Sequence, residues 1–433
     1  MSKFKPSVAA AVVIANMVGT GVFTSLGFQL LEIRSPFVLL LLWAVGGLTA
    51  LCGALSYAEL GAALPRSGGE YNFLSRIYHP SAGFISGWVS ATVGFAAPTA
   101  LAALTFGSYL SSIFPLFSAT GLASALIIVL TIVHSLSHHS SGGTQTLLTW
   151  LKLLLILGFS ALALALSTLP QAVSFSPQSG DLELVTSGAF AVALIYVSYA
   201  YSGWNAATYI SGELEYPQSA LPRVLVASTS VVIVSYLLLN YVFLRTAPMD
   251  AMAGKVEIGF IAASYVFGEQ GAAIMGTLLA LLLVSTVSAM ILAGPRVLHV
   301  IGEDFPLFRR LSAVNSDGIP VRAIVIQACV ALAFLWSASF ESILVFSGAT
   351  MGLNTFFTVL GLFVLRWREP QLHRPYRTWL YPVPPLIFLA ITGWTLFYIV
   401  MQRPAEALIC LVIVVSGIIF YLISLAYGAP RRQ

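Results

Sequence analysis

Long apolar segments, separated by short polar loops, follow one another along the whole chain. Most of them reach the length of about 20 residues at which a helix crosses a bilayer. They predict twelve membrane-spanning helices, at residues 8–31, 36–62, 83–113, 120–137, 146–168, 185–212, 222–246, 260–300, 322–338, 342–365, 380–400 and 405–427. The eighth segment is too long for one span, so we expect an interfacial helix at its beginning. The predicted fold is an all-α polytopic membrane protein with one transmembrane domain over residues 1–433.

Composition and charge support this prediction and orient the chain. Of the 433 residues, 58% are hydrophobic and 8% are charged, and the mean hydropathy is +0.92. If the N-terminus is cytoplasmic, the outer side holds Arg34, Arg245, Lys255 and Arg403, and the inner side holds the other sixteen of the 20 basic residues. Because basic residues collect in cytoplasmic loops, both termini are predicted to lie inside. The basic excess therefore reports topology in a lipid bilayer, and we expect no nucleic-acid partner.

The first span contains Gly19-Thr20-Gly21 near its middle, where an uninterrupted helix would favour helix formers. Glycine weakens a helix because it gains the most backbone freedom when the helix opens. One interpretation is that the two glycines let a neighbouring helix approach closely. The other is a broken helix, whose freed N–H and C=O groups must face protein or a wet cavity. This stretch alone leaves both interpretations open.

The sixth span carries a second candidate interruption, at Tyr199-Ala200-Tyr201-Ser202-Gly203-Trp204-Asn205. Spans one and six begin the two halves of a five-plus-five arrangement, residues 8–168 and 185–365, which two additional helices at 380–427 follow. An odd number of spans in each half makes the second half inverted. Paired broken helices at corresponding positions indicate an inverted-repeat transporter. The pairing therefore favours a binding site at both breaks.

Broken helices offer main-chain groups to a small zwitterion. The N–H groups of residues 20–22 would meet a carboxylate at the positive end of a helix dipole. The carbonyls near residues 17–18 and 199–202 would meet an ammonium group. Tyr199 and Trp204 are large enough to cover the substrate, the alternatives being core packing or, for Trp204, interfacial anchoring. The predicted substrate-binding residues are Met17, Val18, Gly19, Thr20, Gly21, Tyr199, Ser202, Gly203, Trp204 and Asn205.

Lys152 is the one charged residue placed inside a predicted span, roughly 9 Å from the start of the fifth helix at about 1.5 Å per residue. Buried charge in a membrane is costly and usually functional. A fixed ammonium could take the place of a sodium ion between spans one and eight, or it could carry a coupling proton. The alternative is a lysine that snorkels to the cytoplasmic interface. The candidate partners are carbonyls near Ala15 and Asn16 and the hydroxyls of Ser285, Thr286 or Ser288.

No acidic residue accompanies Lys152 within a predicted span interior. Three carboxylates lie near the inner ends of spans, namely Glu59, Glu213 and Glu215. We expect them to pair with nearby cations, Arg66, Arg76 or Arg223. The predicted membrane interior thus lacks an anion for a cationic substrate, which favours zwitterionic substrates.

The remaining chemistry-bearing side chains indicate neither catalysis nor metal binding. The six histidines are scattered, without acidic partners at ligand spacing, so we expect no metal site and no cofactor. A membrane enzyme would place His, Asp or Glu clusters at helix ends, which this sequence does not do. Cys52, Cys329 and Cys410 lie within apolar segments, so no disulfide-linked partner subunit is expected.

Several motifs occur in a fixed order along nearly the whole chain. They are Gly19-Thr20-Gly21-Val22-Phe23, Tyr57-Ala58-Glu59-Leu60-Gly61, Pro65-Arg66-Ser67-Gly68-Gly69-Glu70-Tyr71, Gly87-Trp88, the run from Tyr199 to Asn205, and Asp317-Gly318-Ile319-Pro320. The first resembles the G-[ST]-G-[IV]-F signature of amino acid–polyamine–organocation permeases. The others resemble motifs of its L-type amino acid transporter branch, with Tyr199 in place of the usual phenylalanine.

The resemblance implies a LeuT-type fold and sodium-independent exchange or facilitated transport of neutral L-amino acids by alternating access. By position it implies that Thr20 and Gly21 contact the substrate carboxylate and that Tyr199 acts as a gate. Lys152 matches the fifth-helix lysine of sodium-independent members. The implied ammonium ligands are the carbonyls of Met17, Tyr199 and Ser202.

The chain also departs from the family's pattern. Ala15 and Asn16 replace the usual glycine-rich lead-in, which affects the expected size of the substrate. The loop between spans three and four lacks the cysteine with which animal members join a glycoprotein partner, so the chain is expected to work alone. The short termini suit a bacterial member in the inner membrane. A second hypothesis is a proton-coupled symporter, or an antiporter of cationic amino acids or polyamines, with the same fold.

Overall fold

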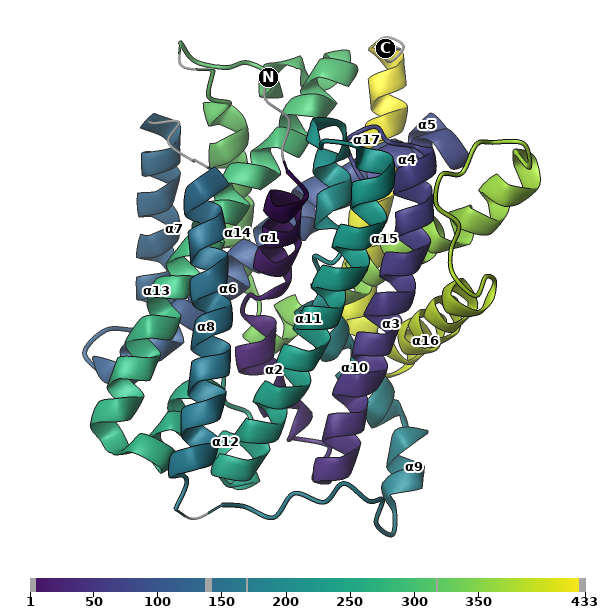
Figure 1. Cartoon of the computed structure of the whole chain (residues 1–433). Helices are drawn as coiled ribbons and strands as arrows, with labels where there is room; N and C mark the ends of the chain where they lie inside the picture. Colours follow the sequence, from purple (N-terminus) through teal and green to yellow (C-terminus); the bar gives the residue numbers. More distant parts are fainter. Residues whose placement is uncertain (1–4, 137–141, 169, 317, 428–433) are drawn as a thin grey trace.

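Helices make up the regular structure throughout the part of the chain that the computed structural model describes, residues 5–136, 142–168, 170–316 and 318–427 (Figure 1). Ten helical stretches of these residues are long and apolar enough to cross a membrane. The other two predicted spans correspond to α14, a shorter apolar helix of 17 residues, and to α10, which ends inside the predicted segment. The predicted all-α polytopic membrane fold is confirmed. Asp317, in the last of the sequence motifs, lies outside the described residues.

The elements follow in chain order. They are α1 (Pro6–Met17), α2 (Gly21–Gln29), α3 (Pro36–Ala63), α4 (Glu70–Ile77), α5 (Pro80–Val89), the π-helical turn η1 (Ser90–Gly94), α6 (Ala96–Ile113), α7 (Ala119–Leu136), α8 (Gly142–Leu166), α9 (Asp181–Val185), α10 (Gly188–Tyr201), the 3-10 helix η2 (Ala206–Glu213), α11 (Pro217–Thr246), α12 (Met249–Met252), α13 (Ile258–Asp304), the 3-10 helix η3 (Pro306–Leu311), α14 (Val321–Ser337), α15 (Phe340–Arg368), α16 (Val383–Gln402) and α17 (Pro404–Ala426).

Local sequence explains where many of these helices begin. Proline occupies the first turn of α1, α3, α5, α11, α16 and α17, where its missing N–H has no intrahelical acceptor to lose. Ser35, Ser187 and Ser339 cap α3, α10 and α15, since each side-chain oxygen accepts a hydrogen bond from an N–H group of the first turn. The polar loops of the sequence pattern thus carry the signals that start the spans.

Both predicted helix breaks are present. α1 ends at Met17 and α2 begins at Gly21, so the first span is interrupted at residues 18–20. α10 ends at Tyr201, and Gly203 takes a φ of 99°, a left-handed conformation that glycine adopts without strain. The chain then continues as η2 instead of an α-helix.

The third and eighth spans are also irregular. The π-helical turn η1 separates α5 from α6 in the middle of the third span. α13 is kinked at Gly268, where φ is 71°, so a separate helical segment precedes the long span, as the length of the apolar run predicted. Such π turns and kinks commonly occur at functional positions in helices.

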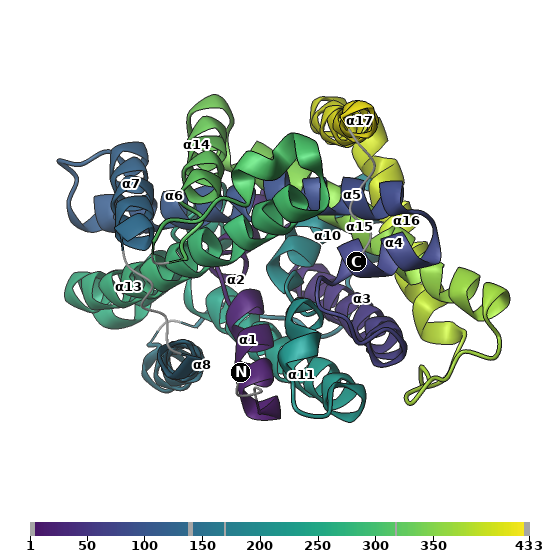
Figure 2. The ribbon, with the colours of Figure 1, turned by 90° about the horizontal axis from the view of Figure 1, so that it is seen from above.

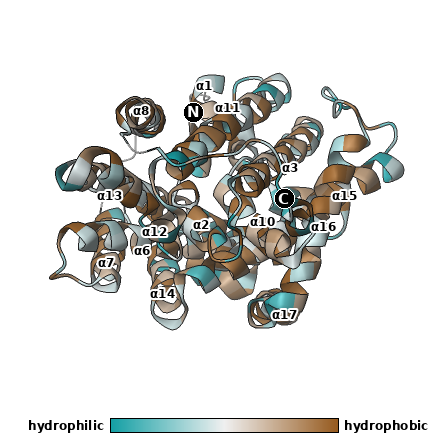
Figure 3. Cartoon of the chain, turned by 90° about the horizontal axis from the view of Figure 1, so that it is seen from below, coloured by the Kyte–Doolittle hydropathy of each residue, from teal (hydrophilic) through white to brown (hydrophobic). Residues whose placement is uncertain are grey.

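The helices surround the two breaks. Both ends of the described chain lie at one end of the molecule, at the top of Figure 1, and α9 and α12 lie at the opposite end. Seen from above, α11 lies between α1 and α3 and packs against both (Figure 2). α8 is coloured mostly hydrophobic and α17 is hydrophobic apart from its visible end (Figure 3), and Leu154 and Leu422 are among their exposed side chains, as expected of surfaces in contact with lipid.

Candidate functional site

A cavity of about 620 Å³ joins the two helix breaks. Its lining includes residues on both sides of each break, the η1 turn of the third span, and the middle of α13 and α15. From the breaks it extends past Arg66 and Tyr71 to Asp304, at the end of the molecule where both chain ends lie. The cavity therefore connects mid-membrane main-chain groups with that side of the molecule.

The two breaks contact each other through glycines. A Cβ atom added to Gly21 would lie 2.4 Å from Cα of Ala200, and one added to Gly203 would lie 2.8 Å from the carbonyl carbon of Asn16. Such distances are too short for any side chain, so only glycine permits both crossings. Gly19 differs, because the nearest atom to its added Cβ, a Thr286 methyl carbon, is 3.9 Å away. Both interpretations of the Gly19-Thr20-Gly21 stretch thus hold, since Gly21 allows close approach at a helix that is also broken.

The start of α2 offers unpaired donors near the cavity. In the described part of the chain, no hydrogen bond uses the N–H groups of Thr20, Gly21 or Val22, as the geometry of a helix N-terminus requires. Thr20 and Gly21 line the cavity, and Val22 is buried behind them. This arrangement can accept an anionic group by main-chain hydrogen bonds.

Nine of the ten residues predicted to bind substrate line this cavity. They are Met17, Gly19, Thr20, Gly21, Tyr199, Ser202, Gly203, Trp204 and Asn205. Val18, the tenth, is buried and absent from the lining. Trp204 is also buried, with its ring edge against Tyr57 at a centroid distance of 4.7 Å, so it packs in the interior and does not anchor the molecule at an interface.

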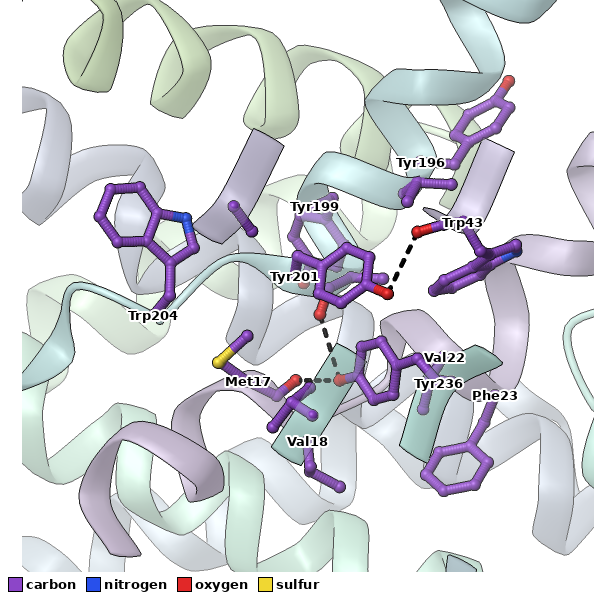
Figure 4. Packing of buried hydrophobic residues seen from close by; sticks show 14 of the residues in the cluster. Met17, Val18, Val22, Phe23, Trp43, Tyr196, Tyr199, Tyr201, Trp204 and Tyr236 are labelled. Carbon is purple, nitrogen blue, oxygen red and sulfur yellow. Dashed lines mark hydrogen bonds between the residues drawn. The ribbon is translucent and has the colours of Figure 1, made fainter. Parts of the chain in front are cut away.

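Tyr236 of α11 joins the two breaks by hydrogen bonds (Figure 4). Its hydroxyl lies 2.6 Å from the carbonyl oxygen of Met17 and 3.2 Å from that of Ala200. The Met17 carbonyl also accepts a hydrogen bond from the N–H group of Gly19, at 2.8 Å, so both its lone pairs are used in this state. The sequence analysis missed Tyr236, whose only signal was a hydroxyl inside the seventh span.

Lys152 lies in the interior and does not snorkel. Its side chain is buried, and its ammonium donates a hydrogen bond to Oγ1 of Thr286, at 2.9 Å, which connects α8 to a cavity-lining residue of α13. The other two candidate hydroxyls have different partners, since Ser285 donates to the Leu282 carbonyl and Ser288 pairs with His134. Ala15 is buried, and no hydrogen bond of the described residues joins its carbonyl to Lys152. Thr286 is thus the predicted partner that the structure bears out.

The prediction that Glu59 pairs with Arg66, Arg76 or Arg223 is wrong. Glu59 is fully buried and accepts two hydrogen bonds from Arg366, at 2.7 and 2.8 Å, and one from the N–H group of Thr378. Arg374 lies 3.5 Å from the same carboxylate. Arg76 pairs instead with Glu369. This cluster fixes the C-terminal end of α3 to that of α15 and lies outside the cavity lining.

Glu70 is a second fully buried carboxylate, and it does line the cavity. Its partners are neutral donors, Tyr57, Asn205 and Tyr209. Glu70 belongs to one of the sequence motifs, but no role was expected for it, because it falls outside the predicted spans. The next residue, Tyr71, donates a hydrogen bond to the Asp304 carboxylate at the cavity mouth. Burial, and then the neighbouring Asp304, raise the pKa of Tyr71, so its hydroxyl keeps its proton.

The opposite side of the breaks is closed by packed side chains. The rings of Phe28 and Phe340 stack with centroids 5.5 Å apart, which joins α2 to α15. Tyr196 donates a hydrogen bond of 2.7 Å to Glu341, which also pairs with Arg403. Burial lowers the pKa of Arg403, but the neighbouring Tyr196 and Glu341 outweigh this and raise it, so the guanidinium keeps its charge. The structure is thus open toward one side only.

Two broken helices, crossing around a cavity within an apolar helical bundle, define a multi-pass membrane protein with a central site for a small polar solute. The family model "Amino acid permease" matches residues 4–423. The chain therefore belongs to the amino acid permease family, whose members matched here are transporters and not enzymes.

The curated relatives cover almost the whole chain. The b(0,+)-type amino acid transporter 1 of Mus musculus is 25% identical over 429 residues, 96% of this chain and 86% of its own length. The large neutral amino acids transporter small subunit 2 of Mus musculus is 27% identical over 426 residues, 95% of this chain and 79% of its own. The cystine/glutamate transporter of Homo sapiens is 26% identical over 434 residues, 98% of this chain and 85% of its own.

Proposed function

We propose that this protein is a sodium-independent transporter of neutral L-amino acids, working by exchange or facilitated transport. The observation that carries the proposal is the meeting of two helix breaks in one cavity, with the unpaired N–H groups of residues 20–22 at one break and the cavity-lining turn at 202–205 at the other. The first would bind the substrate carboxylate. The carbonyls of the second would bind its ammonium, so the main chain recognises what all amino acids share.

Lys152 supports independence from sodium. Lys152 belongs to α8, which packs against both α1 and α13, and its ammonium donates a hydrogen bond to Thr286 of α13, so it lies among elements that a bound cation would otherwise brace. A positive charge at this place would remove the need for a sodium ion. None of the ion pairs among the described residues includes Lys152, and the lack of an acidic partner beside it suits a substrate without net charge.

We further propose alternating access between two inverted halves, residues 8–168 and 185–365, with 380–427 as additional helices. The cavity would be in its inward-open state, because basic residues indicate that the end carrying both termini is cytoplasmic. In the outward-facing state, the contacts that close the opposite side, Phe28 with Phe340 and Glu341 with Arg403, would separate. The chain would reside in a bacterial inner membrane.

The protein is proposed to act without a disulfide-linked partner. Its three cysteines, Cys52, Cys329 and Cys410, belong to α3, α14 and α17, and none lies in the loop at residues 114–118 between α6 and α7. A disulfide to another subunit needs a cysteine exposed in an outer loop. The name of one relative describes a small subunit, and that property is not carried over to this chain.

Uptake by purified protein in liposomes tests the proposal. Labelled forms of the twenty amino acids are screened with and without internal substrate, sodium and a pH gradient. Uptake of neutral amino acids that needs neither sodium nor a pH gradient is expected, and stimulation by internal substrate would identify exchange. Liposomes with a Gly21→Ala protein, which is expected to be inactive, serve as the control. If wild-type liposomes take up none of the twenty amino acids, the proposal is refuted.

One observation favours the second candidate, a proton-coupled transporter or an antiporter of cationic amino acids or polyamines. The Glu70 carboxylate lines the cavity, although the sequence analysis expected no anion there. Its three hydrogen-bond donors already satisfy it, which is why the neutral substrate is preferred. Uptake abolished by a proton ionophore, or competition by arginine or a polyamine, would favour this candidate.

A further inference from the structure

Glu70 holds the turn of the second break by hydrogen bonds. Its Oε1 accepts from the Tyr57 hydroxyl at 2.9 Å and from the Asn205 side-chain amide, and its Oε2 accepts from the Tyr209 hydroxyl at 2.6 Å. Only 1% of Glu70 is exposed, and none of the ion pairs among the described residues includes it. An ionised carboxylate has only acceptor atoms, and three donors directed at it match that form.

The segment that carries Glu70 is built to lie directly against η2. Gly69 has a φ of 52°, and a Cβ atom added to it would lie 2.7 Å from the Tyr209 ring. The Ser67 hydroxyl accepts a hydrogen bond of 2.9 Å from the N–H group of Gly212. The conformation of residues 67–69 thus brings the first turn of α4 onto the helix that follows the break.

Two cavity-lining side chains of the turn, those of Asn205 and Trp204, depend on this carboxylate. The Asn205 amide donates its N–H to Glu70, so its carbonyl oxygen is left for other partners. No hydrogen bond among the described residues joins Trp204 to Glu70, but Tyr57, which donates to Glu70, makes an edge contact with the Trp204 ring at a centroid distance of 4.7 Å. A single buried group therefore orients one residue directly and the other through Tyr57.

We propose that Glu70 is a positioning residue of the transport site, fixing the orientation of the Asn205 amide and of the Trp204 ring at the bound substrate. The proposal rests on the proposed amino acid transport. It assigns to the inner segment before the third span a part in substrate affinity, besides its structural contact with α3. The role requires hydrogen-bond acceptors at this position more than it requires negative charge.

This requirement makes the choice of variant decisive. In Glu70→Gln, the amide oxygen can still accept from Tyr57 and Asn205, and the amide nitrogen can donate to the Tyr209 hydroxyl, which also accepts. In Glu70→Ala, all three donors lose their acceptor. We expect the KM for uptake to rise about tenfold or more in Glu70→Ala, as for a lost hydrogen bond to a charged group, and to stay within about threefold in Glu70→Gln.

The matched control is Glu59→Gln, because Glu59 is equally buried but contacts Arg366 and Arg374 away from the cavity. Each variant is purified in detergent, its melting temperature is measured, and its uptake kinetics are determined with the neutral amino acid that wild-type liposomes take up fastest. Glu59→Gln should lower the melting temperature without changing KM. Should Glu70→Ala fail to purify, Glu70→Asp replaces it, since one methylene less moves the carboxylate from its donors while keeping the charge.

A double-mutant cycle tests whether Glu70 acts through Asn205. Asn205→Ala is expected to raise KM. Glu70→Ala should then raise KM by a smaller factor in the Asn205→Ala protein than it does in the wild-type protein. Additive effects, an unchanged KM in Glu70→Ala, or equal losses in Glu70→Gln and Glu70→Ala would each overturn the inference. Absence of uptake by wild-type protein would instead refute the proposed function, so the two failures are distinguishable.

Discussion

The Tyr236 hydroxyl lies 2.6 Å from the carbonyl oxygen of Met17, the last residue of α1 before the first break. The same hydroxyl lies 3.2 Å from the carbonyl oxygen of Ala200 in α10. The single hydroxyl proton of Tyr236 thus lies between carbonyl groups at the C-terminal ends of α1 and α10. In the proposed alternating access each break would rearrange, so this contact would stabilise the arrangement with the cavity open toward the chain ends.

Replacing Tyr236 with phenylalanine removes this donor and leaves the ring in place. We expect the melting temperature to fall, because an intramolecular hydrogen bond contributes about 0.5–1.5 kcal/mol and buried acceptors lose their partner. The maximal uptake rate should fall more than the KM changes, since the variant alters the stability of one state. Tyr241→Phe, on the same helix but against Phe175, is the control and should behave as wild type. Equal behaviour of the two variants would refute the role of Tyr236.

The two glycines of the first break make unequal contacts, which predicts unequal tolerance to alanine. The added methyl group in Gly21→Ala would overlap the Ala200 backbone, and overpacking of this kind costs about 1–3 kcal/mol or more. We expect loss of uptake and a melting temperature lower by several degrees. In Gly19→Ala the new methyl has ordinary contacts, so the melting temperature should stay near that of wild type. The measurement is a thermal melt of both purified variants, and equal melting temperatures would contradict the prediction.

The positions of the helices follow from local sequence, because apolar run length acts over a few residues. The Gly19-Thr20-Gly21 stretch alone left close packing and a broken helix open, and the second candidate interruption in the sixth span, together with the family's motifs, favoured the α1–α2 and α10–η2 breaks that the structure has. The contacts of the site are not local. Tyr236 is 219 residues from Met17 along the chain, and Glu70 is 135 residues from Asn205. The hydrophobic periodicity of the sequence does not predict the packing that brings such residues together.

The partner of Glu59 shows the same limit. The sequence analysis chose arginines near Glu59 in the chain, whereas the structure pairs it with Arg366, 307 residues away. Spans that are distant in sequence meet at the same end of the molecule, so proximity along the chain is a weak guide to ion pairs there. Thr286 was one of three hydroxyls, with those of Ser285 and Ser288, that the sequence offered as partners of Lys152, and the hydrogen bond in the structure goes to Thr286.

Lys152→Ala tests whether the buried ammonium takes part in transport. The variant removes the donor to Thr286 and leaves a cavity-lining hydroxyl without its charged partner. We expect the uptake rate to fall about tenfold or more, in line with the roughly 1.5–3 kcal/mol of a hydrogen bond to a charged group. Trp150→Leu is the control, since Trp150 lies on the same helix but is 63% exposed on its outer face. An unchanged rate and unchanged ion dependence in Lys152→Ala would make the ammonium dispensable.

The closed side of the molecule provides a last prediction, on the balance between the two access states. Glu341 accepts hydrogen bonds from Tyr196 and Arg403, and its side chain is only 24% exposed. Glu341→Gln removes one charge of this partly buried pair, so it should favour opening on this side. The Asp250–Arg34 pair also lies toward this end but is 94% and 49% exposed, and exposed pairs contribute little. Asp250→Asn should therefore leave the balance unchanged.

A cysteine at Ser198 reports the opening, because this residue lines the cavity with an exposed side chain. The three native cysteines are first replaced, and a membrane-impermeant maleimide is added to intact cells. Labelling of the reporter should be several-fold faster with Glu341→Gln than without it, since the maleimide reaches the cavity from outside only when the outer contacts separate. Asp250→Asn should not change the labelling rate. If both substitutions accelerate labelling equally, general loosening of the outer surface explains the result, and Glu341 has no specific part in closing it.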